Sequence, residues 1–218
     1  MKNLLFLEGP IQTGKSTLIR KCLGAHLADC GGFTSQRLID ADGQTKGFRL
    51  VSAAEPLTAP AEDFMSGGEP KRGTNSDVPF ISDAGIFKWF ADDGRVITDQ
   101  SVFDTIGVSL LRSSARRPLV LLDEIGGSEL LCGEFRKTLD AILSSSKPCL
   151  GVLKLPENAQ RLHSQYPSGD LSIAEYNALL RHTITDSGRG EVLYYARERE
   201  DAEEVERLIS EFIQSIFD

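Results

Sequence analysis

A short glycine-containing segment near the beginning of the chain has the spacing of a phosphate-binding loop. Residues 9–17 read Gly-Pro-Ile-Gln-Thr-Gly-Lys-Ser-Thr and match the pattern G-x-x-x-x-G-K-[ST], the Walker A motif. Gly9 and Gly14 allow a tight turn and a close backbone approach, so that successive N–H groups can point at phosphate oxygens. We therefore expect this segment to bind the phosphates of a nucleotide.

The side chains of this segment have separate expected roles. Lys15 provides a flexible positive charge for the β- and γ-phosphates and is a predicted catalytic residue. Ser16 is predicted to bind Mg²⁺ through its hydroxyl group. The predicted nucleotide-binding residues are Gly9, Pro10, Ile11, Gln12, Thr13, Gly14, Lys15, Ser16 and Thr17. A fortuitous glycine turn is the alternative, and the strand and helix expected on either side argue against it.

Two adjacent carboxylates follow a second apolar run, at residues 119–122. Asp123 and Glu124 then lie at the C-terminal tip of a predicted buried strand, the Walker B position. Because side chains alternate along a strand, the two carboxylates are expected to point in different directions. We predict that Asp123 holds Mg²⁺ through its water shell and that Glu124 activates the water that attacks the γ-phosphorus. A solvated acidic turn is the alternative.

The elements that must position these residues follow from the hydrophobic pattern. Residues 4–7 form a continuous apolar run, typical of a strand buried on both faces, and helical periodicity then extends from Lys15 to Gly31 and Gly32. Further strands are expected at 32–39, 46–52, 86–90, 96–98, 119–122, 149–153 and 192–195. Further helices are expected from Ser101-x-x-Asp104, at 134–143, from Ser172-x-x-Glu175, and over the apolar stripe from Val205 to Phe217.

This alternation predicts an α/β fold, a P-loop three-layer α/β/α sandwich with a mainly parallel central sheet and added hairpins. The 218 residues are expected to form one domain, with residues 53–84, rich in glycine and proline, as a flexible insertion or lid. Within it, Lys71 and Arg72 could close over the phosphates, although a solvated pair is the simpler reading. Arg37 could also face the site, and a charge at the edge of its strand is an equal alternative.

Composition excludes several classes of protein. The 24 basic and 32 acidic residues give a net charge of −8, which opposes binding to nucleic acid. The sequence contains no apolar stretch of the length that a membrane span requires, and no signal-peptide core, so we expect a cytoplasmic protein. The four cysteines lack metal-ligand spacing and are expected to be reduced thiols.

The motifs resemble those of the thermophilic-type nucleoside-triphosphatase family, which includes cancer-related nucleoside-triphosphatase. The resemblance covers about residues 1–135 and rests on three stretches: GKSTLIRK with GGFTS at 31–35 and KGF at 46–48; GRV with SVFD at 94–104; and DEIGGSEL at 123–130 with Phe135. It implies Mg²⁺-dependent hydrolysis of nucleoside triphosphates, ATP and GTP among them, to diphosphate and phosphate with loose base selectivity.

The chain also departs from the family pattern. Gly127 and Ser128 stand where the family has lysine and methionine, so a cation beside the acid pair is expected to be missing and hydrolysis to be slow. Beyond Leu155 the family pattern is not recognisable, which indicates a divergent branch. Two alternatives stay open: a small-molecule or nucleotide kinase whose acceptor binds at 53–84, and a switch or binding module controlled by a nucleotide.

Overall fold

The central feature of the structure, a computed structural model, is one eight-stranded sheet. The structure describes residues 2–55, 65–66, 69–70, 85–163, 172–186 and 188–218. In spatial order the strands of the sheet are β10 (Gly190–Tyr194), β1 (Leu4–Glu8), β9 (Cys149–Leu153), β8 (Val120–Ile125), β2 (Gly31–Ile39), β3 (Thr45–Ser52), β6 (Ile86–Phe90) and β7 (Val96–Thr98). The strands from β10 to β2 run parallel, and β3, β6 and β7 extend the sheet in antiparallel fashion.

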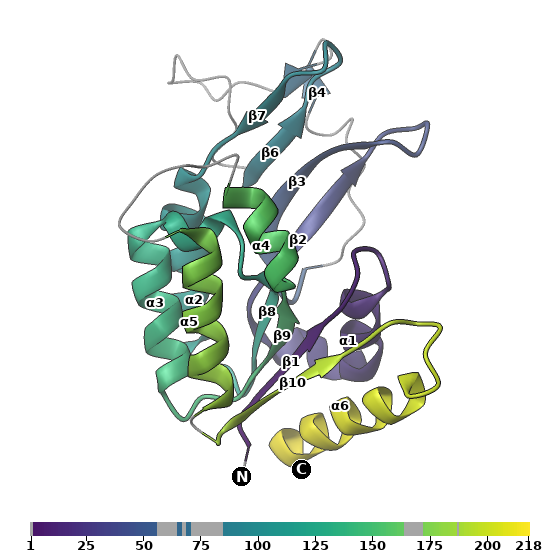
Figure 1. Cartoon of the computed structure of the whole chain (residues 1–218), viewed down its shortest axis with the longest axis vertical. Helices are drawn as coiled ribbons and strands as arrows, with labels where there is room; N and C mark the ends of the chain where they lie inside the picture. The colour runs from purple at the N-terminus through teal and green to yellow at the C-terminus, as the bar shows by residue number, and fades with distance from the viewer. Residues whose placement is uncertain (1, 56–64, 67–68, 71–84, 164–171, 187) are drawn as a thin grey trace.

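Helices cover both faces of the parallel strands (Figure 1). On one face lie α1 (Lys15–Leu23) and α6 (Ala202–Phe217), whose apolar residues share a core with Leu5 and Leu7. On the other face α2 (Val108–Ser113), α3 (Gly133–Ser144) and α5 (Ile173–Thr185) share a core with Leu4 and Phe6. Successive side chains of β1 point in turn into one core and into the other, which explains why its sequence is a continuous apolar run. The predicted three-layer α/β fold is confirmed.

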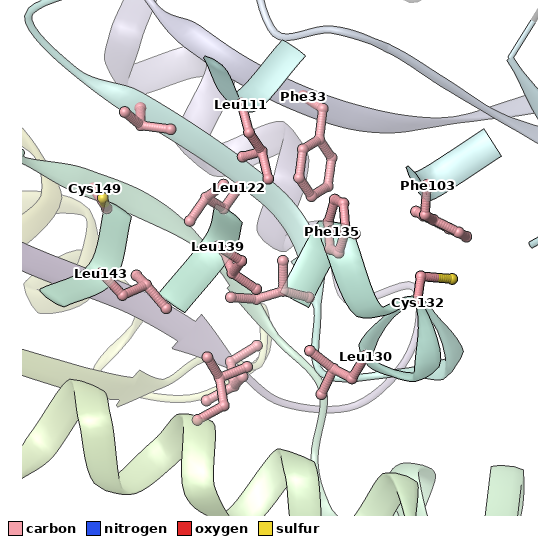
Figure 2. Close-up of a cluster of buried hydrophobic side chains, with 14 of the residues drawn as sticks. Phe33, Phe103, Leu111, Leu122, Leu130, Cys132, Phe135, Leu139, Leu143 and Cys149 are labelled. Atoms are coloured by element: carbon pink, nitrogen blue, oxygen red, sulfur yellow. The ribbon is translucent and has the colours of Figure 1, made fainter. Parts of the chain in front are cut away.

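The core under α2 and α3 is built around aromatic side chains. Figure 2 shows three of them close together: Phe33 of β2, Phe103 of the turn before α2, and Phe135 of α3. The ring centroids of Phe33 and Phe135 are 5.6 Å apart, and those of Phe103 and Phe135 are 5.5 Å apart. Such tilted pairs stabilise a core beyond the burial of their area. This packing anchors β2 and the helices that follow β7 beside the strand that carries the acid pair.

Several expected boundaries differ from the observed ones. The first helix ends at Leu23, because Gly24 has φ 51°, and a 3₁₀ segment (Gly24–Asp29) continues the chain to β2. The strand expected at 119–122 continues to Ile125. A short helix, α4 (Pro156–His163), was not predicted.

The two predicted capping boxes have different outcomes. Ser172 and Glu175 form theirs at the start of α5. The one predicted for Ser101 and Asp104 is wrong. Ser101 instead donates its N–H and hydroxyl to Asp99, and the Asp104 carboxylate accepts a hydrogen bond from the N–H of Phe135. Asp104 therefore joins the π-helical turn Phe103–Gly107 to α3 rather than closing its own helix.

The predicted lid at 53–84 falls mostly outside the described residues, as do Lys71 and Arg72. Two short strands of this stretch are described, β4 (Met65–Ser66) and β5 (Glu69–Pro70), and they pair with each other. Among the residues that the structure describes, no helix has the length and apolar character needed to cross a membrane.

Candidate functional site

The order of the parallel strands brings the two predicted motifs to one edge of the sheet. The phosphate-binding loop leaves the C-terminal end of β1, and the acid pair lies at the C-terminal end of β8. These strands are not neighbours, because β9 pairs with both of them. The C-terminal end of β9 therefore lies between the two motifs. In open α/β sheets ligands bind outside the C-terminal ends of the strands.

The glycines of the loop are required by its geometry. Gly9 has φ +143°, and a Cβ there would lie 2.1 Å from the carbonyl oxygen of Tyr195, which follows β10. Gly14 has φ +87° at the start of α1. Gln12 also adopts a positive φ, 64°, without being glycine. Such a backbone presents its N–H groups on one side, as an anion site needs.

Lys15 lies inside the loop rather than in solvent. Its side chain is 7% exposed, and its ammonium donates hydrogen bonds to the carbonyl oxygens of Gly9 (2.9 Å) and Pro10 (2.5 Å) and to Thr13 Oγ1 (3.4 Å). Burial lowers the pKa of Lys15, while the nearby carboxylates of Glu124 and Asp123 oppose that shift. The ammonium is thus held within the loop, at the position where the motif predicts that phosphates bind.

Other loop residues differ in exposure. Ile11 is 68% exposed at the tip of the loop, and Pro10 is exposed beside it. Thr13 donates its hydroxyl to the carbonyl oxygen of Pro10 at 3.0 Å. Thr17 follows Ser16 in the first turn of α1. These residues form the loop predicted from the sequence, and its apolar tip faces outward.

The two predicted metal ligands meet directly. The hydroxyl of Ser16 donates a hydrogen bond of 2.7 Å to Oδ1 of Asp123. Asp123 is 3% exposed, and burial raises its pKa to about 6, although the hydrogen bond from Ser16 opposes this shift. A buried carboxylate without a cation is electrostatically costly, so the position favours a bound positive charge.

The donors at this position suit magnesium. Mg²⁺ prefers oxygen ligands and binds through one or two carboxylates together with substrate phosphates and water. The hydroxyl of Ser16 and the carboxylate of Asp123 are such donors, so the site fits the ion. Within the described ranges no group of three or more His, Cys, Asp or Glu side chains could hold a metal by itself. The phosphates and water would therefore complete the coordination.

Glu124 has a partner that the sequence did not predict. The ammonium of Lys154, the residue after β9, lies 2.5 Å from Oε2 of Glu124. The side chains of Lys154 and Glu124 are 24% and 32% exposed, so the pair borders the open edge of the sheet. Burial would lower the pKa of Lys154, yet Glu124, Glu129 and Asp123 together raise it. Lys154 is therefore charged.

The expectation that no cation lies beside the acid pair is wrong. It rested on Gly127, but Lys154 reaches the same region from the next strand. A Cβ on Gly127 would lie 2.9 Å from Cε of Lys154 and 3.1 Å from its Cδ. A lone lysine after a strand has no sequence signature, so only the strand order could have revealed it.

The loop after the acid pair is fixed by a buried carboxylate. Oε1 of Glu129 accepts hydrogen bonds from the N–H groups of Gly126 (2.6 Å) and Gly127 (2.7 Å). Burial raises the pKa of Glu129, while Lys154 and these two N–H groups oppose that shift. The carboxylate thus holds the backbone next to Glu124.

Helix α5 supports the site from beneath. The side-chain amide of Asn177, 1% exposed, donates to the carbonyl oxygens of Gly126 (2.9 Å) and Lys154 (3.2 Å). Arg181, one turn later, donates to the same Lys154 oxygen at 3.1 Å and pairs with Glu8, the last residue of β1. One helix therefore joins the tips of β1, β9 and β8, and the region beyond residue 155 thereby contributes to the site.

Two arginines lie on the elements next to the loop and the acid pair, Arg37 on β2 and Arg20 on α1. Arg37 is exposed on β2, beyond Thr34, which pairs with Asp123 in the sheet. Arg20 of α1 was not predicted as a site residue. It donates to Thr34 Oγ1 (3.4 Å) and to the carbonyl oxygens of Ala53 (3.2 Å) and Glu55 (2.8 Å). Arg20 therefore links α1 to β2 and to the segment after β3.

Comparisons with known proteins show which proteins this chain is similar to. Residues 80–186 match the model of a family described as NTPase. The chain is 28% identical over 151 residues to nucleoside-triphosphatase THEP1 of Thermotoga petrophila, covering 69% of this chain and 71% of that protein. It is 27% identical over 144 residues to nucleoside-triphosphatase THEP1 of Methanosarcina barkeri, covering 64% of this chain and 70% of the other.

A solved structure has the same fold. The crystal structure of THEP1 from Aquifex aeolicus superimposes with a TM-score of 0.55 at 16% identity, over 98% of this chain and 99% of that one. At this identity the likeness concerns the fold alone. The family model begins after the phosphate-binding loop, so the loop is an observation independent of that match.

Proposed function

We propose that this chain, which is similar to THEP1 nucleoside-triphosphatases, hydrolyses nucleoside 5'-triphosphates, ATP and GTP among them, to diphosphate and phosphate with Mg²⁺ as cofactor. The hydrogen bond between Ser16 and Asp123 carries the proposal. Lys15 precedes Ser16 and Glu124 follows Asp123, so this one contact brings a phosphate-binding cation, two metal donors and a base into one site.

Binding of the phosphates is assigned to the loop and to Lys15. The loop N–H groups and the N-terminus of α1 favour an anion, and the ammonium of Lys15 exchanges its carbonyl partners for β- and γ-phosphate oxygens. Ser16 and Asp123 would hold Mg²⁺, which when bound neutralises charge on the phosphate oxygens. All these groups are present before the substrate arrives, and such preorganisation lowers the cost of ordering them.

The chemical step is assigned to Glu124. A water molecule attacks the γ-phosphorus in line with the bond to the β,γ-bridging oxygen, and that bond breaks. The nucleoside diphosphate leaves with the bridging oxygen. The proton of the attacking water passes to the carboxylate of Glu124. The ion pair with Lys154 engages Oε2 of Glu124, which leaves Oε1 for the proton.

Selectivity for the base is expected to be loose. The proposed contacts are all to phosphates, and the sequence contains no Asn-Lys-x-Asp signature of the kind that reads guanine. We expect kcat/KM for ATP, GTP, CTP and UTP to differ by no more than about a hundredfold, or about 2.7 kcal/mol of differential binding.

Phosphate release over a panel of nucleoside triphosphates tests the proposal. The purified chain is assayed with Mg²⁺ and with EDTA, and with and without small hydroxyl acceptors or nucleoside monophosphates. We expect release that needs Mg²⁺ and no acceptor. Transfer to an acceptor would identify a kinase instead. Turnover that stays far below one per minute until a protein partner is added would identify a switch.

A further inference from the structure

Lys154 is placed between the two halves of the proposed site. It follows β9, which pairs with β1 on one side and with β8 on the other. The phosphate-binding loop leaves β1, and Glu124 lies at the tip of β8. A side chain that extends from the tip of β9 therefore reaches the space between the loop and the acid pair, and the ion pair of Lys154 with Glu124 shows that this one does.

The course of the Lys154 side chain is fixed by its neighbours. Its methylene groups lie over Gly127, where a Cβ would collide with Cε at 2.9 Å. A side chain at position 127 would therefore make the flexible end of Lys154 shift from its present path. The absence of a Cβ at Gly127 leaves the room through which the lysine passes.

The backbone of Lys154 is held on both sides. Its N–H donates to the carbonyl oxygen of Ile125 at 2.8 Å. Its carbonyl oxygen accepts from Asn177 at 3.2 Å and from Arg181 at 3.1 Å. These three hydrogen bonds hold the backbone of Lys154 in place. Only the side chain of Lys154 then has to be ordered when its ammonium binds a ligand.

The charges of the site favour an anion next to Lys154. Lys15 lies buried in the loop that follows β1, and Lys154 follows the neighbouring strand β9 with its ammonium at Oε2 of Glu124, so two cations flank the region between the loop and the acid pair. In the free protein Glu124 is the anionic partner of Lys154. A phosphate group that enters between two lysines is attracted to both.

We propose that Lys154 is a second phosphate-binding residue, which contacts the γ-phosphate of a bound triphosphate and so distinguishes triphosphate from diphosphate. This rests on the proposed function, since it takes the phosphate chain to run from the loop toward the acid pair. Lys15 serves the β- and γ-phosphates together. Lys154 lies beside the base, at the end where only a triphosphate has a group, and its contribution is therefore selective.

Binding measurements on Lys154→Met test this assignment. Dissociation constants are measured by titration calorimetry with Mg²⁺ for ADP and for a triphosphate analogue with a non-hydrolysable β,γ bond. We expect the affinity for the analogue to fall by about tenfold or more, as for the loss of one charge-assisted contact, while that for ADP changes less than twofold. Lys137→Met, on the surface of α3, is the matched control and should change neither constant.

Two further variants guard against misfolding and against an unpaired Glu124. Lys154→Arg keeps the charge and should retain part of the preference for the analogue. Lys154→Met combined with Glu124→Gln removes both members of the ion pair and should show the same selective loss. Equal changes for ADP and the analogue, or no change for either, would overturn the proposal. Because hydrolysis is not measured, failure of the proposed function shows separately, as absence of phosphate release by the wild type.

Discussion

The hydroxyl of Ser16 and the carboxylate of Asp123 share a 2.7 Å hydrogen bond although 107 positions separate them in the sequence. The contact joins the first turn of α1 to the tip of β8. Both groups are oxygen donors suited to Mg²⁺. Asp123 is buried, so the desolvation of its charged carboxylate costs free energy that a bound cation would offset. The free protein therefore holds the two proposed metal donors together in advance.

Replacing Asp123 by Asn should uncouple nucleotide binding from magnesium. Asparagine keeps the size and can still accept the hydrogen bond from Ser16, but it lacks the charge that attracts the cation. In the wild type we expect ATP to bind more tightly with Mg²⁺ than with EDTA. In the variant the two affinities should be equal. Titration calorimetry measures both, and a variant that keeps the full magnesium effect would place the metal elsewhere.

Glu124→Gln should separate binding from chemistry. The amide cannot accept the proton of the attacking water, and general-base assistance is typically worth about 10²–10⁴ in rate. We expect kcat to fall within that range while the affinity for the non-hydrolysable analogue stays close to that of the wild type. Glu134→Gln is the control, because the side chain of Glu134 is exposed on the surface of α3. Wild-type phosphate release by the Glu124 variant would reduce Glu124 to a surface acid.

Lys15→Ala should abolish the response of the protein to nucleotide. The ammonium is buried in the loop and serves the phosphates, so affinity and turnover should fall together. The measurement is the shift in Tm on adding Mg-ATP, which reports binding to the folded state. Lys21→Ala removes an exposed lysine of the same helix and should keep the full shift. An undiminished shift without Lys15 would mean that nucleotide binds at another place.

Asn177→Ala should impair the site without touching substrate. The variant leaves the carbonyl oxygens of Gly126 and Lys154 without this donor, at a cost of about 1–3 kcal/mol in stability. If Asn177 positions Lys154, the preference for the triphosphate analogue over ADP should also fall. A lower Tm with an unchanged preference would restrict Asn177 to a structural role. Asn158→Ala, on α4, is a control for loss of an asparagine nearby.

Sequence patterns predicted those parts of the molecule that depend on local chemistry. The glycines and Lys15 of the loop lie as expected, because the motif itself fixes the turn. Asp123 and Glu124 lie at a strand tip, because an apolar run before acid marks one. Lys154 was missed since its role depends on the placement of β9 between β1 and β8, and no local pattern records that order. Gly127 was misread for the same reason: the cation enters from a neighbouring strand.

Polar contacts between distant elements were equally hidden. Asp104 has the spacing of a capping residue, yet in the fold its carboxylate accepts from the N–H of Phe135. The sequence around Asn177 predicts a helix, but it does not predict which backbone groups the side chain of Asn177 contacts. Such residues become informative once the packing of helices on the sheet is known, because a buried amide or carboxylate must find partners that the chain brings from elsewhere.

The pairing of β1 bears on how the chain acquires its fold during synthesis. β1 precedes every other described strand, yet both of its neighbours, β9 and β10, belong to the last third of the sequence. Contacts of such long sequence separation close slowly. The strand that carries the phosphate-binding loop therefore keeps two open edges in the nascent chain until β9 and β10 have been synthesised.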